Sequence, residues 1–163
     1  NKGYISELLA GAFEKAASGK EKLSVAVLDI DHFKRFNDNF GHLAGDNILQ
    51  LLATAMRKLS RPEDYVGRFG GEEFLIILSD TVFDRAMKYA ERLRKEIEKL
   101  GNLLIKRYPG HALTISVGVA TYEPDLKNWK MLVEKADEAL YSAKNLGRNR
   151  VVGFYSAERK FLP

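Results

Sequence analysis

Four carboxylates stand in two short clusters that could hold a metal ion. Asp29 and Asp31 lie where an apolar run ends, and Glu72 and Glu73 directly follow a glycine pair. Carboxylate oxygens are hard ligands, the chain has no cysteine, and its 3 histidines are scattered, so Mg²⁺ or Mn²⁺ fits better than zinc. Carboxylates that hold Mg²⁺ at the edge of a sheet suit phosphoryl chemistry on a nucleotide.

Basic residues that could meet the phosphates of such a substrate are Lys34, Arg35, Lys144 and Arg148. Taken singly, each of them also fits a solvated surface charge. In the same way Asp29 could cap the segment after its strand, and an isolated Gly-Gly-Glu-Glu could be a solvated turn. The second acidic cluster favours a site over a turn.

Composition sets the class of protein. The chain has 163 residues, 45% of them hydrophobic and 29% charged, which suits one soluble globular domain with a real core. The absence of cysteine excludes disulfides and thiolate metal sites. No apolar run approaches the roughly 20 residues of a membrane span, and no signal peptide is visible, so we expect a cytoplasmic protein. The formal charge of +4 suits an anionic ligand without arguing for nucleic acid.

A central strand and a hairpin must position the carboxylates. The run Leu23–Ile30 is apolar on both faces and rich in β-branched residues, as in a central strand. Alternation along it places Asp29 and Asp31 on the same side. The strand Tyr65–Phe69 and the apolar run that begins at Phe74 form a hairpin, with the glycine pair at its tip.

The remaining helices and strands are predicted from hydrophobic periodicity and from the residues that cap or end helices. Helices are predicted over Tyr4–Ala17, from an N-cap at Asp80 to a stop at Gly101, and from an N-cap at Asn128 to Gly147. Residues 41–46 lead into a further helix that runs to about Leu59. Strands are predicted over Ala112–Tyr122 and Arg150–Tyr155, residues 32–39 form a polar basic segment, and residues 103–108 form a short strand or a loop. This order predicts an α+β domain with a central, mostly antiparallel sheet flanked by helices.

An ordered set of motifs carries a family resemblance over nearly the whole chain. Each motif is weak alone, but together and in this order they resemble the GGDEF family, the diguanylate cyclases, in its GGEEF variant. The motifs are Asp29-Ile30-Asp31-His32-Phe33-Lys34, Asn37-Asp38, Gly41-His42 with Gly45-Asp46, Arg68-Phe69-Gly70-Gly71-Glu72-Glu73-Phe74, Ala136-Asp137-Glu138-Ala139-Leu140-Tyr141, and Ala143-Lys144 with Gly147-Arg148-Asn149.

The resemblance implies a fold like the palm of adenylyl cyclases and polymerases, with a ferredoxin-like core. Residues 1–163 would form one GGDEF catalytic domain. The family's acidic leader before the first helix is absent, and Asn1-Lys2 looks like its tail. We therefore expect a fragment without its N-terminal regulatory domain, a region that could anchor the full-length protein in a membrane. We expect no membrane contact in this fragment and no direct binding of nucleic acid.

The resemblance also implies the reaction and its metal site. Two GTP molecules would be condensed to cyclic di-GMP with release of two pyrophosphates. Mg²⁺ (or Mn²⁺) would be held by Asp29, the carbonyl of Ile30 and Glu72, with Glu73 as a further ligand. Glu72 would also accept the proton of the 3′-hydroxyl. Because one domain offers one nucleotide site, catalysis would need a homodimer.

Substrate-binding residues carry over by position. Asn37 and Asp46 would read the guanine edge, and an aspartate there can accept hydrogen bonds that adenine cannot offer. Phe33 and His42 would belong to the nucleotide pocket. Two further roles concern the phosphates: Lys34 would stabilise developing charge, and Lys144 with Arg148 would clamp the triphosphate.

A second site is implied for the product. Arg61-Pro62-Glu63-Asp64 matches the family's RxxD product-inhibition motif, and Arg92 matches the arginine that completes it. Without the family this segment would be a charged loop. Two other functions stay open: a receptor that binds cyclic di-GMP through Arg61, Asp64 and Arg92 without catalysis, and a cyclase of altered product. The intact Gly-Gly-Glu-Glu-Phe counts against the first, and Asp46 with Asn37 against the second.

Overall fold

One mixed sheet forms the centre of the computed structural model, which describes residues 2–104, 106–155 and 160–162. Within these residues the sheet has six strands in the order β2-β3-β1-β4-β5-β6. Neighbouring strands are antiparallel except β4 and β5, which are parallel. The strands are β1 (Leu23–Ile30), β2 (Tyr65–Arg68), β3 (Glu73–Ser79), β4 (Ile115–Thr121), β5 (Arg150–Tyr155) and β6 (Lys160–Leu162).

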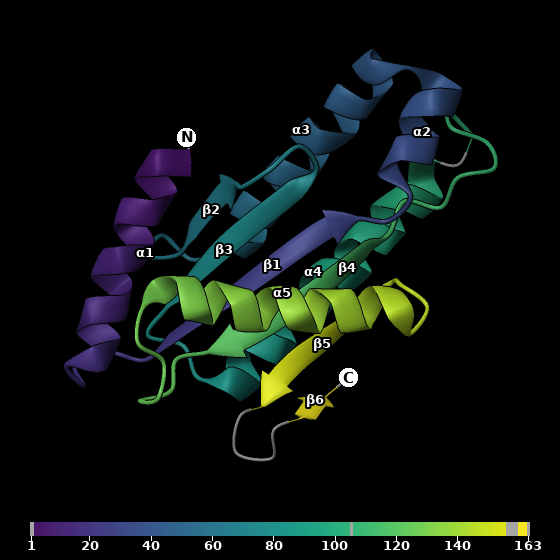
Figure 1. Ribbon diagram of the computed structural model, residues 1–163. Helices are drawn as coiled ribbons and strands as arrows, with labels where there is room; N and C mark the ends of the chain where they lie inside the picture. Colours follow the sequence, from purple (N-terminus) through teal and green to yellow (C-terminus); the bar gives the residue numbers. More distant parts are fainter. Residues whose placement is uncertain (1, 105, 156–159, 163) are drawn as a thin grey trace.

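Helices cover both faces of the sheet. In Figure 1, α5 crosses in front of the strands while α4 lies behind them. One hydrophobic core lies between the sheet and α2, α3 and α4, and another lies between the sheet and α1 and α5. The helices are α1 (Lys2–Ala17), α2 (Phe33–Phe40), α3 (His42–Leu59), α4 (Phe83–Leu104) and α5 (Trp129–Asn145). The predicted α+β architecture with a mostly antiparallel sheet is confirmed.

The central strand β1 decides which face of the sheet receives the first acidic cluster. All of its residues are buried, as the run of apolar side chains on both faces requires. Leu28 and Ile30 pack toward α2, α3 and α4, whereas Val25 and Val27 pack toward α1 and α5. Asp29 shares the parity of the two valines, so its carboxylate lies on the α5 side of the sheet.

The predicted order of elements placed no helix in the polar, basic segment 32–39, but residues 33–39 belong to the helix α2. Two buried rings on one face, Phe33 and Phe36, hold this short helix against the core. Phe36 also packs edge-on against Tyr108, with ring centroids 4.9 Å apart, and 5.7 Å from the ring of His111. Phe33, Phe36 and Phe40 stand at helical spacing, but a helix of 8 residues is marginal by itself, so its contacts with the core stabilise it.

Both predicted ends of α4 were also wrong. Asp80 does not cap it, because α4 begins at Phe83 and the Asp80 Oδ1 atom accepts a hydrogen bond from the Lys22 backbone N–H at 2.9 Å. Gly101 does not end it, because the helix continues to Leu104. A Cβ at Gly101 would lie 2.6 Å from the carbonyl oxygen of Leu113, so this glycine permits close packing rather than a stop.

Other boundaries agree more closely. The Asn128 side chain accepts from the backbone N–H of Met131, as predicted for the cap of α5. Gly147 has a φ of 120°, which fits its predicted place after the helix. Strand β4 begins at Ile115, later than predicted, and β6 was not predicted. Of the segment 103–108, Leu103 and Leu104 are helical, while residue 105 lies outside the described residues.

We expect Gly118→Ala to destabilise the fold strongly, because α5 lies directly on β4 at this glycine. An added Cβ would stand 2.0 Å from the Ala136 carbonyl oxygen and 2.3 Å from the Leu140 nitrogen, both backbone atoms that cannot rotate away. The free energy of unfolding should fall by about 2–4 kcal/mol in urea titration. Gly11→Ala is the control, since nothing lies within 4 Å of its Cβ position in α1 and alanine favours a helix. Equal stability of the two variants would contradict this close packing.

Candidate functional site

The pairing of β1 with β3 brings the two acidic clusters together. Asp29 lies directly opposite Glu73 in the antiparallel register. Side chains of directly opposed residues project from the same face of the sheet, with Cβ atoms about 4.5–5.5 Å apart. Two like charges in this position repel each other, so the arrangement favours a cation between or beside them. The predicted meeting of the two clusters therefore follows from the strand register.

The turn that carries Glu72 is braced from inside. The backbone N–H groups of Phe69 and Gly70 both donate to the Glu73 carbonyl oxygen, at 2.8 and 3.2 Å. Arg68, which lies outside the predicted site, donates from Nε to the Gly71 carbonyl oxygen at 2.9 Å. Nothing lies within 4 Å of the Cβ position of Gly71, so the outer side of the turn is open to an approaching molecule. Neither glycine needs a positive φ here, in contrast to many hairpin tips.

Asp29 has one oxygen that is paired and one that is not. Its Oδ2 atom accepts a hydrogen bond from Lys144 Nζ on α5 at 2.5 Å. Its Oδ1 atom is buried and has no hydrogen-bond partner among the described residues. A buried carboxylate oxygen without a partner is costly unless a ligand completes it. This orphaned oxygen fits the expected metal ion.

The donor set suits a hard divalent cation such as Mg²⁺ or Mn²⁺. No group of three or more acidic or histidine side chains within the described part of the chain is preformed around a single point. Mg²⁺ takes one or two carboxylates, keeps several waters and completes its shell with substrate phosphates. The residues present, with Asp29 and Glu72 near each other, match that mode of binding rather than an all-protein cage.

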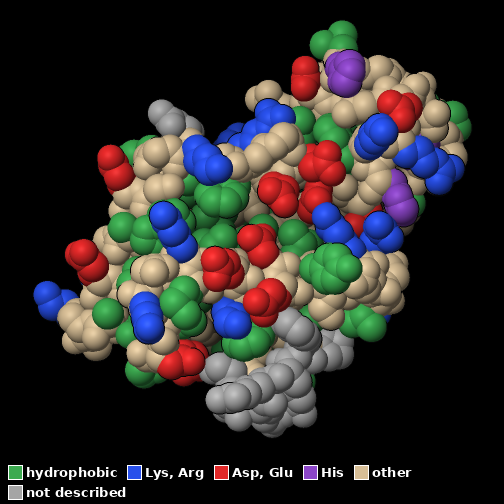
Figure 2. Space-filling model, in the orientation of Figure 1, with side chains coloured by type: hydrophobic (Ala, Val, Ile, Leu, Met, Phe, Trp, Pro, Cys, Tyr) green, Lys and Arg blue, Asp and Glu red, His purple; other side chains and the backbone are tan. Residues whose placement is uncertain are grey.

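Negative charge is crowded around the turn. Burial raises the pKa of the Glu72 carboxyl, and the neighbouring charge of Asp29 raises it further, while Lys144 acts in the opposite direction. On α5, burial followed by the charge of Glu73 raises the pKa of Asp137 to about 6. Figure 2 shows acidic side chains gathered over the ends of β1 and β3, with lysine and arginine side chains around them. A divalent cation would relieve this repulsion.

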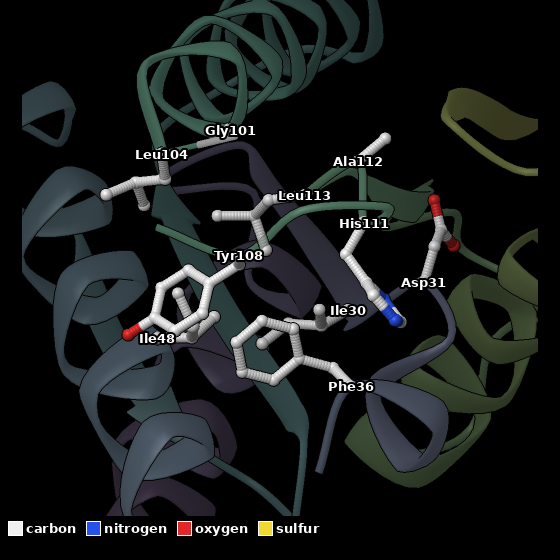
Figure 3. Close-up of a pocket in the computed structure, with 10 residues that line it drawn as sticks. All are labelled: Ile30, Asp31, Phe36, Ile48, Gly101, Leu104, Tyr108, His111, Ala112 and Leu113. Atoms are coloured by element: carbon white, nitrogen blue, oxygen red, sulfur yellow. The ribbon is translucent and has the colours of Figure 1, made fainter. Parts of the chain in front are cut away.

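An aromatic cluster fixes α2 beside the carboxylates. Figure 3 shows Phe36, Tyr108 and His111 around a small cavity of about 10 Å³, with Asp31 at its edge. His111 also bonds the Asn39 side chain through Nε2 at 2.8 Å. These contacts hold α2 so that Lys34, on its first turn, is exposed to solvent. Lys34 makes no ion pair with any described residue, so its charge is available to a ligand.

A larger hollow lies between α3 and the β2–β3 hairpin. It has a volume of about 500 Å³. Its lining residues are Asp46, Leu49, Gln50, Ala53, Arg57, Val66, Gly67, Arg68 and Phe74. Asn37 lies next to it, against Gly45, where a Cβ would come within 1.8 Å of the Asn37 Oδ1 atom. That Oδ1 atom is buried without a partner among the described residues, which suits a ligand-binding amide.

Two residues predicted for the nucleotide pocket do not line this hollow, and their role there stays a prediction. His42 is exposed on the first turn of α3 and does not line the hollow. Phe33 is 6% exposed and belongs to the core beneath Gly45, so it supports the pocket from below. Arg148 follows α5, and its backbone N–H donates to the Ala143 carbonyl oxygen at 3.0 Å.

Asp31, which was also considered as an oxygen ligand, differs from Asp29 because both of its oxygens accept hydrogen bonds. Its Oδ1 atom accepts from the Ser116 hydroxyl at 2.6 Å. Its Oδ2 atom accepts from the Thr114 hydroxyl at 2.7 Å and from the Asn149 backbone N–H at 2.9 Å. Both oxygens are therefore committed to the protein. The polar residues at the start of β4 were the available sequence signal for these bonds.

The RxxD segment forms a second, separate pocket of about 320 Å³. Arg61 donates to both Asp64 oxygens, at 2.9 and 3.2 Å, and to the Ser79 carbonyl oxygen and the Thr81 hydroxyl, each at 2.7 Å. The Asp64 side chain is only 2% exposed, so in this state it orders the loop rather than facing solvent. The complete lining is Leu59, Arg61, Asp64, Leu78, Thr81, Arg85, Lys88, Tyr89 and Arg92.

Arg92 lines this pocket together with Arg61, and it donates to the Leu59 carbonyl oxygen at 3.1 Å. Arg85 and Lys88 were missed. They precede Arg92 on α4 at helical spacing, so the pattern of basic residues along one face could have revealed them. The pocket therefore holds four basic side chains in its lining, which suits an anionic ligand.

Comparisons with known proteins point to one family. The family described as "Diguanylate cyclase, GGDEF domain" matches residues 1–150. Diguanylate cyclase A of Treponema denticola is 45% identical over 134 residues, which is 81% of this chain and 35% of that protein. Diguanylate cyclase DgcP of Pseudomonas aeruginosa is 40% identical over 93% of this chain and 22% of its own length. The chain thus spans about a third or less of these relatives.

Solved structures share the fold. The GGDEF domain of DgcB from Caulobacter crescentus, in complex with c-di-GMP, is 34% identical and has a TM-score of 0.85, covering 94% of this chain and 90% of that one. The active GGEEF domain of a diguanylate cyclase from Vibrio cholerae is 30% identical, with a TM-score of 0.88 and coverage of 95% and 97%. With the family match over most of its length, this chain belongs to the GGDEF domain family of diguanylate cyclases.

Proposed function

We propose that this chain is a catalytic domain that condenses two GTP molecules into cyclic di-GMP, with release of two pyrophosphates. The observation that carries the proposal is the buried, unpartnered Oδ1 atom of Asp29 beside Glu72 and Lys144. The family match supports it, as do relatives named diguanylate cyclase and a neighbouring structure in complex with c-di-GMP.

The metal site would consist of Asp29, the Ile30 carbonyl and Glu72, with Glu73 as a further ligand. The bound Mg²⁺ or Mn²⁺ would polarise the α-phosphate and balance the charge of the triphosphate. Glu72 would take the proton of the 3′-hydroxyl as that oxygen forms its bond to the α-phosphorus of the second GTP. The bond from the α-phosphorus to the bridging oxygen then breaks, and pyrophosphate leaves with the electron pair.

Basic side chains would manage the phosphate charge. Lys34 would contact the phosphates from α2, and Lys144 with Arg148 would hold the triphosphate from the end of α5. Lys144 Nζ lies 2.5 Å from Asp29 Oδ2, so the ammonium group would donate both to this carboxylate and to the substrate phosphates. A lysine would suit a position between the Asp29 carboxylate and the substrate phosphates, because it is a compact charge with three donors.

Guanine would be selected in the hollow between α3 and β2. The exposed carboxylate of Asp46 lines it and can accept from the ring N–H and exocyclic amine of guanine. Asn37 would add an amide contact through its unpartnered oxygen. Adenine offers no such pair of donors, so ATP would leave the carboxylate unpaired.

Two chains would be needed for each product molecule. The described residues hold one Asp46 hollow and one Asp29 centre, whereas the product joins two identical nucleotides, so a homodimer with two-fold symmetry would present two substrates to each other. We also infer a cytoplasmic location for this domain, since GTP is an intracellular substrate. Among the described helices, none is long and apolar enough to span a membrane.

The test is incubation of the protein with GTP or with ATP in the presence of Mg²⁺, with the products identified by chromatography. We expect cyclic di-GMP from GTP and no cyclic product from ATP. Activity per molecule should rise with protein concentration when the protein is dilute, because half-sites must pair. A constant activity per molecule down to concentrations where sizing shows only monomer would contradict the two-chain site. Binding of cyclic di-GMP without GTP turnover would instead indicate a receptor.

A further inference from the structure

The turn between α5 and β5 has an unusual backbone. Three consecutive residues have positive φ angles: Gly147 at 120°, Arg148 at 64° and Asn149 at 46°. Glycine adopts such angles freely, but arginine and asparagine adopt them at a cost, because the Cβ atom crowds the backbone. A turn of this kind persists only when surrounding contacts hold it.

Asp31 supplies one of those contacts from the end of β1. Its Oδ2 atom accepts the Asn149 backbone N–H at 2.9 Å, although the two residues are 118 positions apart. The carboxylate is itself fixed by the hydroxyls of Thr114 and Ser116, at 2.7 and 2.6 Å. Asp31 is only 7% exposed, and hydrogen bonds to a buried carboxylate are strong. The strand that carries Asp29 is therefore bonded directly to the turn that carries Arg148.

The Asn149 side chain holds the same turn from the opposite layer. Its Oδ1 atom accepts from Arg94 on α4 at 2.9 Å, and its Nδ2 atom donates to Glu98 one turn further along that helix. Arg94 is in turn paired with Glu91 at 2.7 Å. The turn is thus bonded to the sheet end on one side and to α4 on the other, so its conformation is fixed with respect to the whole core.

This turn determines the positions of two basic residues at the end of α5, Lys144 and Arg148. Lys144 lies in the last turn of α5 and bonds Asp29, while Arg148 bonds back to the Ala143 carbonyl oxygen in that same helix end. Movement of the turn would shift Arg148 and the end of α5, which carries Lys144, relative to Asp29. Arg148 makes no ion pair with the described residues, so nothing else fixes its charge.

We propose that Asp31 is a positioning residue for the triphosphate of the substrate, which it controls by fixing the Arg148-Asn149 turn. This inference rests on the proposed use of GTP. It assigns Asp31 no contact with metal or substrate, because one of its oxygens accepts one hydrogen bond and the other accepts two. Figure 3 shows Asp31 at the edge of the small apolar cavity.

The experiment compares Asp31→Ala with a matched loss of buried hydrogen bonds at the other end of the same strand. Ser24→Ala is the control, because Ser24 is fully buried and its hydroxyl bonds the Thr81 carbonyl oxygen and the Thr121 hydroxyl, both at 2.7 Å. Asp31→Asn is the conservative variant. Its amide keeps one oxygen for Thr114 and Asn149, and its NH₂ can donate to the Ser116 hydroxyl.

Three readouts separate positioning from folding: the KM for GTP, the affinities for GTP and for guanosine by calorimetry with Mg²⁺, and hydrogen exchange at residues 147–150. We expect Asp31→Ala to raise the KM about tenfold, as for one lost charge-assisted contact. Its GTP affinity should fall by a similar factor while its guanosine affinity is kept, and the Asn149 amide should lose protection. Asp31→Asn should recover most of the loss. Ser24→Ala should lower thermal stability without raising the KM.

The outcomes distinguish this inference from the proposed function. An unchanged GTP affinity in a folded Asp31→Ala protein, or an equal loss in Ser24→Ala, would overturn the positioning role. If Asp31→Ala lost guanosine affinity as much as GTP affinity, a general packing role would replace it. If the wild-type protein bound GTP and made no cyclic di-GMP while Asp31→Ala selectively lost GTP affinity, the proposed reaction would fall and the positioning role would stand. A wild-type protein that binds no GTP would overturn both.

Discussion

Glu72→Gln is expected to abolish formation of cyclic di-GMP, with a loss of about a thousandfold or more, because one change removes the proposed general base and a proposed metal ligand together. Glutamine keeps the size and shape of the side chain. It cannot take up the proton of the 3′-hydroxyl, and it offers the metal a weaker, neutral oxygen. Turnover of GTP with Mg²⁺, measured beside circular dichroism, checks this result.

Glu72→Gln should lower activity but should not lower the stability of the fold. The pKa of Glu72 is raised in the folded chain, so the folded state binds more protons than the unfolded state once the pH passes the ordinary carboxyl range. Stability therefore falls as the pH rises through that window, and a neutral side chain removes the penalty. Without metal, Glu72→Gln should unfold at the same temperature as the wild type or higher at neutral pH.

Metal binding supplies a third measurement. Mg²⁺ with GTP should raise the unfolding temperature of the wild type, since ligands that bind only the folded state stabilise it. The shift should be smaller in Glu72→Gln. Glu7→Gln, an exposed change on α1, is the control and should behave as wild type in all three assays. Turnover close to wild type in a folded Glu72→Gln protein would remove Glu72 from the proposed centre.

Arg61→Ala is expected to weaken product inhibition by about 10- to 150-fold, which corresponds to the loss of roughly 1.5–3 kcal/mol from one charge-assisted contact. We propose that Arg61 and Arg92 hold the phosphates of cyclic di-GMP in the pocket that they line together. GTP turnover without product should stay within a few-fold of wild type, because the pocket does not share a lining residue with the hollow that contains Asp46.

The internal bonds of Arg61 shape the design of this test. Its guanidinium donates to Asp64, Ser79 and Thr81, so product would have to compete for some of these donors. The predicted pairing of Asp64 with a guanine edge requires the loop to open, because that side chain is 2% exposed. Binding of product by Asp64 and by the two arginines stays a prediction. Asp64 would need the loop to open, whereas the arginines would need only to reorient.

Two variants serve as controls for the inhibition curve. Arg61→Lys keeps the charge and loses the planar fork, so it should fall between wild type and Arg61→Ala. Arg107→Ala removes an exposed arginine that lies outside this pocket and should leave inhibition unchanged. If wild type and Arg61→Ala give the same inhibition curve, residues 61–64 are only a charged loop, in which Arg61 pairs with Asp64.

The limits of sequence reasoning appear at α2 and α4. Residues 32–39 were expected to be polar and basic, with no helix among them, yet residues 33–39 are helical and Phe36 packs on Tyr108. Gly101 was expected to stop a helix, yet it lies where α4 meets Leu113 too closely for a side chain. In both places a contact between distant segments overrode the local preference.

The sequence by itself determined the type and order of the chemical groups: the apolar strand that ends at Asp29, the glycine pair before Glu72, and the Asn128 cap of α5. Only the tertiary structure decided how they meet. It set Asp29 opposite Glu73, brought Lys144 to Asp29 across 115 positions, and used Asp31 to hold the Asn149 turn. The physical reason is that alternation along a strand fixes the face of a carboxylate, whereas its partners come from the register of other strands and the packing of a helix.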